Sequence, residues 1–167
     1  MLHCLKSLIN YFLIFRFDMI QLIKTNSENK DFIDLVKLLD ADLKIRDGED
    51  HDFYNQYNSI DKLNHVIIAY ENDEAVGCGA FKQMEDDTVE IKRMFVNPYH
   101  RGKKIATKVF VGLELWIQES GYTKALLETG IRMPEAIGLY KKCGYQIIEN
   151  YGQYKGMDTS VCFSKQF

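Results

Sequence analysis

The sequence predicts one α+β domain in which a mixed central β-sheet is flanked by helices. Three observations support this class. Apolar residues recur at helical spacing in several segments, very short turns join three consecutive β segments, and a further β segment follows a helix. Short turns imply antiparallel pairing, whereas a strand that returns through a helix pairs parallel to the strand before it. The expected order of elements is β-α-α-β-β-β-α-β-α-β-β.

The first elements are a short strand at 20–24 and an amphipathic helix after it. We expect Asn26 or Ser27 to cap this helix, and Asp47-Gly48 to end the region. The segment 50–58 is polar with aromatic residues and predicts a short second helix. The apolar residues of the first helix fall at helical spacing: Phe32, Leu35, Val36, Leu39 and Leu43.

The middle of the chain predicts three strands in series, at 65–70, 75–84 and 88–96. The segments 71–74 and 85–87 are the turns between them. Because both turns are tight, the three strands should form an antiparallel meander.

The last third of the chain predicts two helices and three strands. The first helix covers 101–120, has an apolar face that includes Val109 and Leu113, and ends at Gly121. Pro134 opens the second helix and Gly144 ends it. The strands are expected at 124–128, 145–150 and 160–166, the first of them parallel to the strand before the 101–120 helix.

Size and composition limit the function classes. The 167 residues suit one domain with a single core, and the net charge of -3 gives no general attraction to nucleic acid. The four cysteines are scattered and include no C-x-x-C pair, which argues against a zinc site or a disulfide framework. We therefore expect a cytoplasmic protein with no metal, no nucleic-acid partner and no membrane partner.

The first 18 residues form an apolar extension of uncertain role ahead of a single domain at 19–167. The apolar run between Lys6 and Arg16 is too short to span a bilayer as a helix, and no small-residue cleavage site follows it. A secretion signal and a membrane-surface anchor are the minor alternatives. Met19 is an alternative start, and whether residues 1–18 belong to the working protein stays open.

An unusual group of charges follows the strand at 88–96. Arg101, Lys103 and Lys104 lie at a helix start, where acidic residues would suit the helix dipole, and Gly102 permits close backbone approach. A helix start presents free N–H groups that attract phosphate. The turn therefore predicts a site for a phosphate-bearing cofactor, with a solvated basic turn as the alternative. A P-loop and a dinucleotide fingerprint are excluded, because the glycines that they need are missing.

The stretch VEIKRMFVNPYHRGKKIATKVF resembles the acyl-CoA-binding motif of the GCN5-related N-acetyltransferases (GNAT). In that family a strand leads through a proline to R/Q-x-x-G-x-G/A at a helix start. Residues 101–106 match this pattern with one departure, since Lys104 stands where glycine is usual.

A second stretch, LLETGIRMPEAIGLYKKCGYQII, is similar to the family's later motif, A-I-x-L-Y-x-K-x-G-F/Y on a helix after a strand. Met133 stands where many members have asparagine. Together the two motifs imply the GNAT fold from about residue 19 to the end. They also imply direct transfer of an acetyl group from acetyl-CoA to a primary amine of a small molecule or peptide.

The resemblance implies a role for each matching position. The backbone of Met94, Phe95 and Val96 would pair with the pantetheine arm like an extra strand. Tyr140 would protonate the departing thiolate, because the pKa values of a phenol and a thiol, about 10 and about 8.5, are close. The other expected cofactor residues lie at the turn and on the later helix: Arg101, Gly102, Lys103, Lys104, Ile105, Ala106 and Lys142.

Two carboxylates are candidates for the base that takes the proton from the attacking amine. Glu90 comes first, although its alternation with Lys92 would equally suit a solvent-facing strand residue. Glu128 comes second, at the carboxyl end of a parallel strand, where ligands gather. His100, beside the phosphate turn, reads as a surface residue rather than a base.

The acidic and aromatic segment after the first helix is expected to line the acceptor site. Asp50, Asp52 and Tyr54 are the predicted substrate contacts, because carboxylates and aromatic faces suit a cationic amine. A solvated polar helix is the alternative.

Two other functions stay open. One is a non-catalytic acyl-CoA-binding regulatory protein that kept the fold, and the other is a nucleotide-binding protein that uses the 101–106 turn without acyl transfer. The sequence identifies neither the acceptor amine nor the oligomeric state, and a homodimer is compatible with it.

Overall fold

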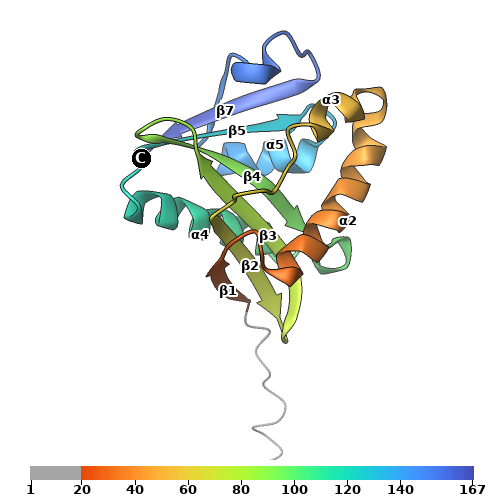
Figure 1. The fold of residues 1–167 in the computed structure, drawn as a ribbon, viewed down its shortest axis with the longest axis vertical. Helices are drawn as coiled ribbons and strands as arrows, with labels where there is room; N and C mark the ends of the chain where they lie inside the picture. Colours follow the sequence, from red (N-terminus) through yellow and green to blue (C-terminus); the bar gives the residue numbers. More distant parts are fainter. Residues whose placement is uncertain (1–19) are drawn as a thin grey trace, which may run out of the picture.

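A seven-stranded sheet forms the centre of the structure, a computed structural model that describes residues 20–167 (Figure 1). In spatial order β1-β2-β3-β4-β5-β7-β6, every neighbouring pair is antiparallel except β4 and β5. The predicted meander and the parallel return strand are confirmed. The extension at 1–18 and the alternative start at Met19 lie outside the described residues. The strands are β1 (Gln21–Thr25), β2 (His65–Glu71), β3 (Glu74–Gln83), β4 (Thr88–Val96), β5 (Lys124–Gly130), β6 (Gln146–Ile148) and β7 (Ser160–Gln166).

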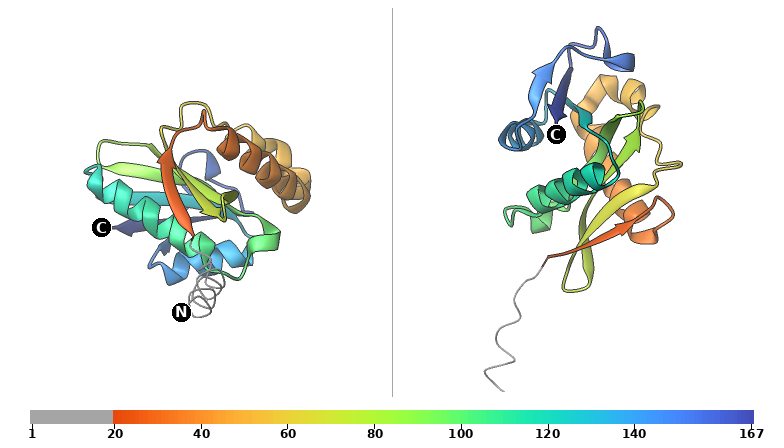
Figure 2. Two further views of the ribbon diagram at one scale, coloured as in Figure 1. Left: turned by 90° about the horizontal axis from the view of Figure 1, so that it is seen from below. Right: turned by 90° about the vertical axis from the view of Figure 1, so that its left-hand side faces the viewer.

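Helices cover both faces of this sheet (Figure 2). One face carries α2 (Lys30–Asp47) and α3 (His51–Asn55), and the other carries α4 (Ile105–Glu119) and α5 (Pro134–Lys142). The alternation along β2 matches this arrangement. Val66 and Ile68 pack in the α2 cluster, whereas Ile67 and Ala69 pack in the α4 cluster. The predicted order of helices and strands is confirmed.

The start of α2 corrects the predicted cap. Asn29 is the N-cap, and its Oδ1 accepts hydrogen bonds from the N–H groups of Asp31 at 2.9 Å and Phe32 at 3.4 Å. The expectation of Asn26 or Ser27 was wrong, because both serve the preceding turn. Asn26 Oδ1 accepts from the N–H of Glu28, and the N–H of Ser27 donates to the carbonyl of Leu63.

The predicted start of the helix at 101–120 was also wrong. Pro98–His100 forms a 3-10 turn, and α4 begins only at Ile105. Gly102 at φ +83° and Lys104 at φ +62° adopt left-handed backbone conformations, which interrupt a right-handed helix. The helix expected at 50–58 and the strand expected at 145–150 are shorter than predicted, at His51–Asn55 and Gln146–Ile148.

The sheet opens along β4. The register between β3 and β4 shifts between Cys78 and Ala80, and Arg93 in this β-bulge has φ +60°. Gly79 lies opposite the bulge, where a Cβ would approach Met94 Sδ to 2.4 Å. The pairing of β4 with β5 ends at Ile91 and Leu127. The two strands begin together and separate along their lengths in Figure 1, so the last part of β4 has strand pairing on the β3 side only.

Candidate active site

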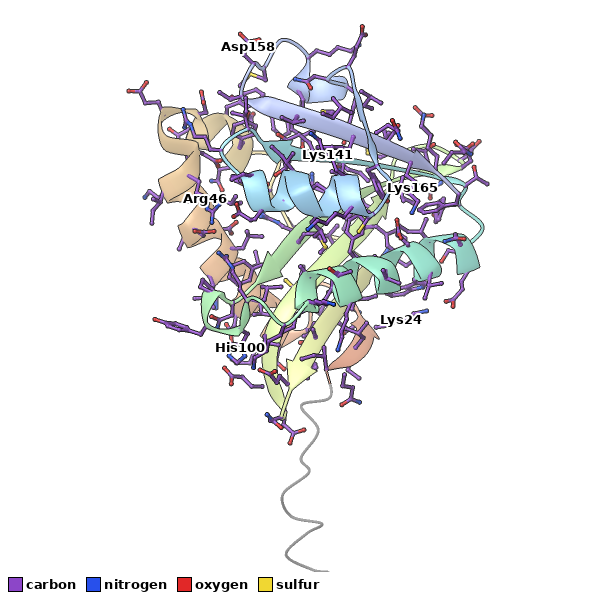
Figure 3. The ribbon with its side chains drawn as sticks, turned by 180° about the vertical axis from the view of Figure 1, so that it is seen from behind. Lys24, Arg46, His100, Lys141, Asp158 and Lys165 are labelled. Atoms are coloured by element: carbon purple, nitrogen blue, oxygen red, sulfur yellow. The ribbon has the colours of Figure 1, made fainter. Side chains whose placement is uncertain are left out.

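A groove of about 630 Å³ opens where β4 and β5 separate. Its walls come from α2, from the turn before α4 and from α5. Figure 3 shows Arg46 on α2 and His100 ahead of α4 on the side where α4 and α5 begin. The volume lies in the range of about 300–1,000 Å³ that is typical of small-molecule sites. The predicted cofactor residues that line it are Met94, Phe95, Val96, Arg101, Gly102, Lys104, Ile105, Ala106 and Lys142.

The turn before α4 is built to receive an anion. No side chain caps the first N–H groups of α4, whose N-cap is Lys104. Left-handed residues next to a helix start aim several N–H groups at one point, and such a nest binds phosphate. Lys104 stands where the family motif has glycine, and its left-handed backbone costs about 1–2 kcal/mol for a residue with a Cβ.

Lys103 points away from the groove. Its Nζ lies 2.7 Å from both carboxylate oxygens of Glu71, and Nδ1 of His100 lies 2.7 Å from Oε2. Glu71 is only 4% exposed at the end of β2, and Lys103, followed by His100, lowers the pKa of its carboxyl. His100 is therefore a partly covered residue in contact with Glu71 rather than a surface one. No motif in the sequence indicates Glu71, which ties the turn at 101–104, the anion turn, to the β2–β3 hairpin.

A second, smaller cavity of about 120 Å³ adjoins the groove. It lies between the end of α2, α3 and the ends of β4 and β5. Tyr140, Met94 and Met133 line both spaces, so the groove and the cavity meet at these side chains. A cosubstrate in the groove and an acceptor in the cavity would therefore meet beside Tyr140.

Tyr140 on α5 is 6% exposed and packs between the rings of Phe110 and Phe163, at centroid distances of 5.3 and 5.8 Å. Burial raises the pKa of its phenol, and the negative charge of Glu128 raises it further. Within residues 20–167 no hydrogen bond engages its hydroxyl. Tyr140 thus offers a protonated, unengaged donor at the junction of the two spaces.

Glu90 lines the smaller cavity but is already engaged. It is 1% exposed, accepts a hydrogen bond from the Tyr151 hydroxyl at 3.0 Å, and lies 3.2 Å from Lys92 Nζ and 3.4 Å from Lys82 Nζ. The solvent-facing alternative for Glu90 was therefore wrong. With two ammonium groups and a phenol on this carboxylate, a proton from an amine would have to displace existing contacts.

Glu128 lines the same cavity and has fewer contacts to its carboxylate than Glu90. Its Oε1 is buried and has no hydrogen-bond partner in the described part of the chain. Burial raises the pKa of Glu128 to about 7, against smaller opposing effects of Ser160 and Lys92. A carboxyl that titrates near neutral pH at a cavity wall is suited to general base chemistry.

Only one of the three predicted acceptor residues lines the cavity. Tyr54 lines the cavity, and its hydroxyl lies 2.8 Å from the hydroxyls of Thr159 and Ser160. Asp50 and Asp52 line neither space, and Asp47 takes their place from the last turn of α2. From the sequence, Asp47 was predicted only to end the helix region together with Gly48. Among residues 20–167 no group of His, Cys, Asp or Glu is arranged to hold a metal ion, and no helix is long and apolar enough to cross a membrane.

Comparison with known proteins identifies the family of this α+β domain. The sequence profile of the Acetyltransferase (GNAT) family matches residues 32–145, and the chain belongs to this family. It is 35% identical over 101 residues to an IAA acetyltransferase of Azospirillum brasilense, covering 60% of this chain and 65% of that one. It is 33% identical over 92 residues to "Probable N-acetyltransferase 14" of Xenopus tropicalis, covering 54% and 45%. The chain thus spans less than two thirds of the length of these relatives.

Solved structures give the same fold. A candidate acyl-CoA N-acyltransferase of Klebsiella pneumoniae superposes with a TM-score of 0.75 at 27% identity, covering 89% of this chain and 98% of that one. A GNAT acetyltransferase of Elizabethkingia anophelis, whose structure holds acetyl-CoA, superposes with a TM-score of 0.65 at 19% identity, covering 90% and 99%. The predicted GNAT fold is confirmed.

Proposed function

We propose that this chain is an acetyl-CoA-dependent N-acetyltransferase that moves an acetyl group directly to a primary amine of a small molecule or peptide. The observation that carries the proposal is the position of Tyr140, a buried phenol between a groove suited to the cosubstrate and a cavity walled by the carboxylate of Glu128, whose Oε1 has no hydrogen-bond partner among residues 20–167. Membership of the GNAT family and the acetyl-CoA in the Elizabethkingia structure support the choice of donor.

The groove fits the parts of acetyl-CoA. The unpaired edge of β4 at Met94–Val96 offers backbone N–H and C=O groups to the amide-bearing pantetheine arm, as a sheet edge does to an added strand. The turn at 101–104 and the uncapped start of α4 offer N–H groups and cations to the pyrophosphate. When bound, the cosubstrate supplies the thioester whose acyl group is transferred.

Two side chains of this protein handle the protons. Glu128 accepts one proton from the amine, whose nitrogen forms a bond to the acyl carbon as the bond from carbon to sulfur breaks. The Tyr140 phenol donates a hydrogen bond to the sulfur as negative charge develops there. The ordinary pKa of a phenol, about 10, already exceeds that of a thiol, about 8.5, and burial raises the pKa of Tyr140 further. Its main contribution is therefore charge stabilisation in place of the proton transfer expected from the sequence, and the thiolate gains its proton on release.

The alternatives fit less well. A non-catalytic acyl-CoA-binding regulator has no use for a buried carboxylate at the cavity wall with an oxygen that no described residue hydrogen-bonds, because such a group costs stability. A nucleotide-binding protein has no use for the second cavity beyond Tyr140. We also propose a cytoplasmic location, because Cys78, Cys143 and Cys162 are all free thiols in the structure.

The proposal predicts that acetyl-CoA raises the melting temperature of the protein. At a concentration of about 100 times Kd, a ligand that binds only the folded state adds about 2.7 kcal/mol. For a chain of this size, about 2–4 °C corresponds to each kcal/mol, so a rise of roughly 5–10 °C is expected. Thermal shift with acetyl-CoA, ATP and buffer measures it. A rise with ATP alone would favour the nucleotide-binding function. After a rise with acetyl-CoA, thiol release with a panel of amines tests acetyl transfer.

A second prediction concerns Glu71, which holds the anion turn. Glu71→Gln should weaken acetyl-CoA binding about tenfold, because a neutral amide cannot retain both Lys103 and His100 and the turn loses its fixed position. Isothermal titration calorimetry measures the Kd. Glu85→Gln, which removes an exposed carboxylate on the next turn, is the control. An unchanged Kd for Glu71→Gln would show that the turn holds its shape without this ion pair.

A further inference from the structure

The smaller cavity contains a second carboxylate that lacks a close cation, besides Glu128. The side chain of Asp47 is only 7% exposed, and among the described residues the basic group paired with its carboxylate within 4 Å is His51, whose Nδ1 lies 3.7 Å from Oδ2. That separation exceeds a hydrogen bond. Arg132 donates to the backbone carbonyl of Asp47 at 2.7 Å, and no ion pair within residues 20–167 joins it to the carboxylate. Burial is the largest influence on the Asp47 carboxyl and raises its pKa, with His51 and, less strongly, Arg132 opposing.

The cations of the cavity are already neutralised by other groups. Lys92 Nζ lies 3.2 Å from Glu90, and Arg93 lies 2.9 Å from Asp40 and also donates to the carbonyl of Asn58. Neither cation is paired with Asp47 or with Glu128 in the structure. The cavity therefore presents two carboxylates that no cation of the described residues contacts within hydrogen-bond distance.

These two carboxylates lie at different positions along one wall of the cavity. Asp47 Oδ1 comes within 4.0 Å of the place where Gly130 would carry a Cβ. Gly130 follows Glu128 by two residues on β5, so the two residues face the same side of the strand, and their Cα atoms lie about 7 Å apart. The absence of a side chain at Gly130 leaves the space between them open to an acceptor.

We propose that the acceptor is a small amine with a second positive charge, such as a diamine, and that Asp47 binds the charge remote from the reacting nitrogen. This inference rests on the proposed function and names its substrate class. One nitrogen lies at Glu128 and loses its proton, and the other stays charged at Asp47. An acceptor with a carboxylate at its far end would instead meet Asp47 and be repelled. The cavity volume of about 120 Å³ restricts the part of the acceptor bound inside it to a few heavy atoms.

The test uses three probes with the same four-carbon chain: 1,4-diaminobutane, 1-aminobutane and 4-aminobutanoate. Release of the CoA thiol from acetyl-CoA is followed with each probe at pH 8, where Glu128 is mostly ionised. We expect kcat/KM for the diamine to exceed that for 1-aminobutane by about tenfold or more, the effect of one charge-assisted hydrogen bond. The value for 4-aminobutanoate should be the lowest of the three.

Asp47→Asn should bring the ratio of kcat/KM for the diamine to that for 1-aminobutane close to one. Asp61→Asn, which removes an exposed carboxylate that lines neither space, should keep the wild-type ratio. A general loss of structure would lower both rates together and leave the ratio unchanged, so the ratio isolates the contact at Asp47.

Three results would overturn the inference. Equal kcat/KM for the diamine and 1-aminobutane in the wild-type protein would do so even if Asp47→Asn failed to fold, and so would a preference for 4-aminobutanoate. A diamine preference that survives in folded Asp47→Asn would remove the role of Asp47. In all three cases the proposed acetyltransferase function stands. Thiol release with none of the amines, together with no thermal shift by acetyl-CoA, would overturn that function as well.

Discussion

Replacement of Tyr140 by phenylalanine is expected to lower kcat by about 10²–10³-fold, the usual effect of removing one donor that stabilises charge in the transition state. The KM for acetyl-CoA should change little, since the ring keeps its contacts with Phe110 and Phe163. The buried, protonated phenol at the junction of groove and cavity is the reason for this separation of effects. Steady-state measurement of thiol release with a primary amine at saturating acetyl-CoA gives both constants.

Tyr145→Phe is the matched control. Tyr145 is 3% exposed, packs against the same Phe110 ring, and lines neither the groove nor the cavity. Its buried hydroxyl has no hydrogen-bond partner among the described residues, so its removal should leave kcat unchanged and the melting temperature equal or higher. Equal turnover in the wild type and in Tyr140→Phe would show that the thiolate departs without help from this phenol.

The order of elements was predictable because it depends on local signals. Helical spacing of apolar residues and two tight turns sufficed for the meander, and the single parallel pair followed from the helix between its strands. The ends of the elements were less predictable. Lys104 takes a left-handed conformation that its residue type disfavours, and only the folded turn around it explains why α4 begins at Ile105.

The residues of the candidate site were also only partly predictable from the sequence. Residues in the two contiguous motifs mostly line one groove, because a strand, a turn and a helix carry them there together. Lys103 and Lys104 nevertheless diverge, since only the first meets Glu71. Asp47 ends α2 and Glu71 ends β2, and both lie outside the two sequence motifs. Their importance depends on burial and on partners in space, and no local pattern of residues carries that information.

Replacement of Glu128 by glutamine is expected to act on activity and on stability in opposite directions. kcat/KM should fall by about 10²-fold or more at pH 7.5, because the proton of the amine loses its acceptor. In the wild-type protein kcat/KM should rise with pH through about 7, the pKa of this carboxyl, and the variant should lack that rise. A pH–rate profile of both proteins from pH 5.5 to pH 9 measures the two effects.

The stability of Glu128→Gln follows from the same shifted pKa. The pKa is about 7 in the folded protein against an ordinary value of 4.5, so the folded state binds this proton more tightly than the unfolded state. The contribution of the carboxyl to the free energy of unfolding therefore falls as pH rises from 4.5 to 7 and stays low above it. Glutamine removes this penalty, and we expect the free energy of unfolding at pH 8 to rise by roughly 1–3 kcal/mol, with little change at pH 4.5.

Glu90→Gln gives the contrast that makes this result specific. Glu90 is the other candidate base, and its carboxylate holds Lys92, Lys82 and the Tyr151 hydroxyl. Its replacement leaves two ammonium groups without their partner, so stability should fall at pH 8 rather than rise. Urea unfolding of the two variants at pH 4.5 and pH 8 decides between the carboxylates. A lower free energy of unfolding for Glu128→Gln at pH 8 would mean that Glu128 has a stabilising partner. If the rise in kcat/KM near neutral pH survived in Glu128→Gln but not in Glu90→Gln, the base would be Glu90.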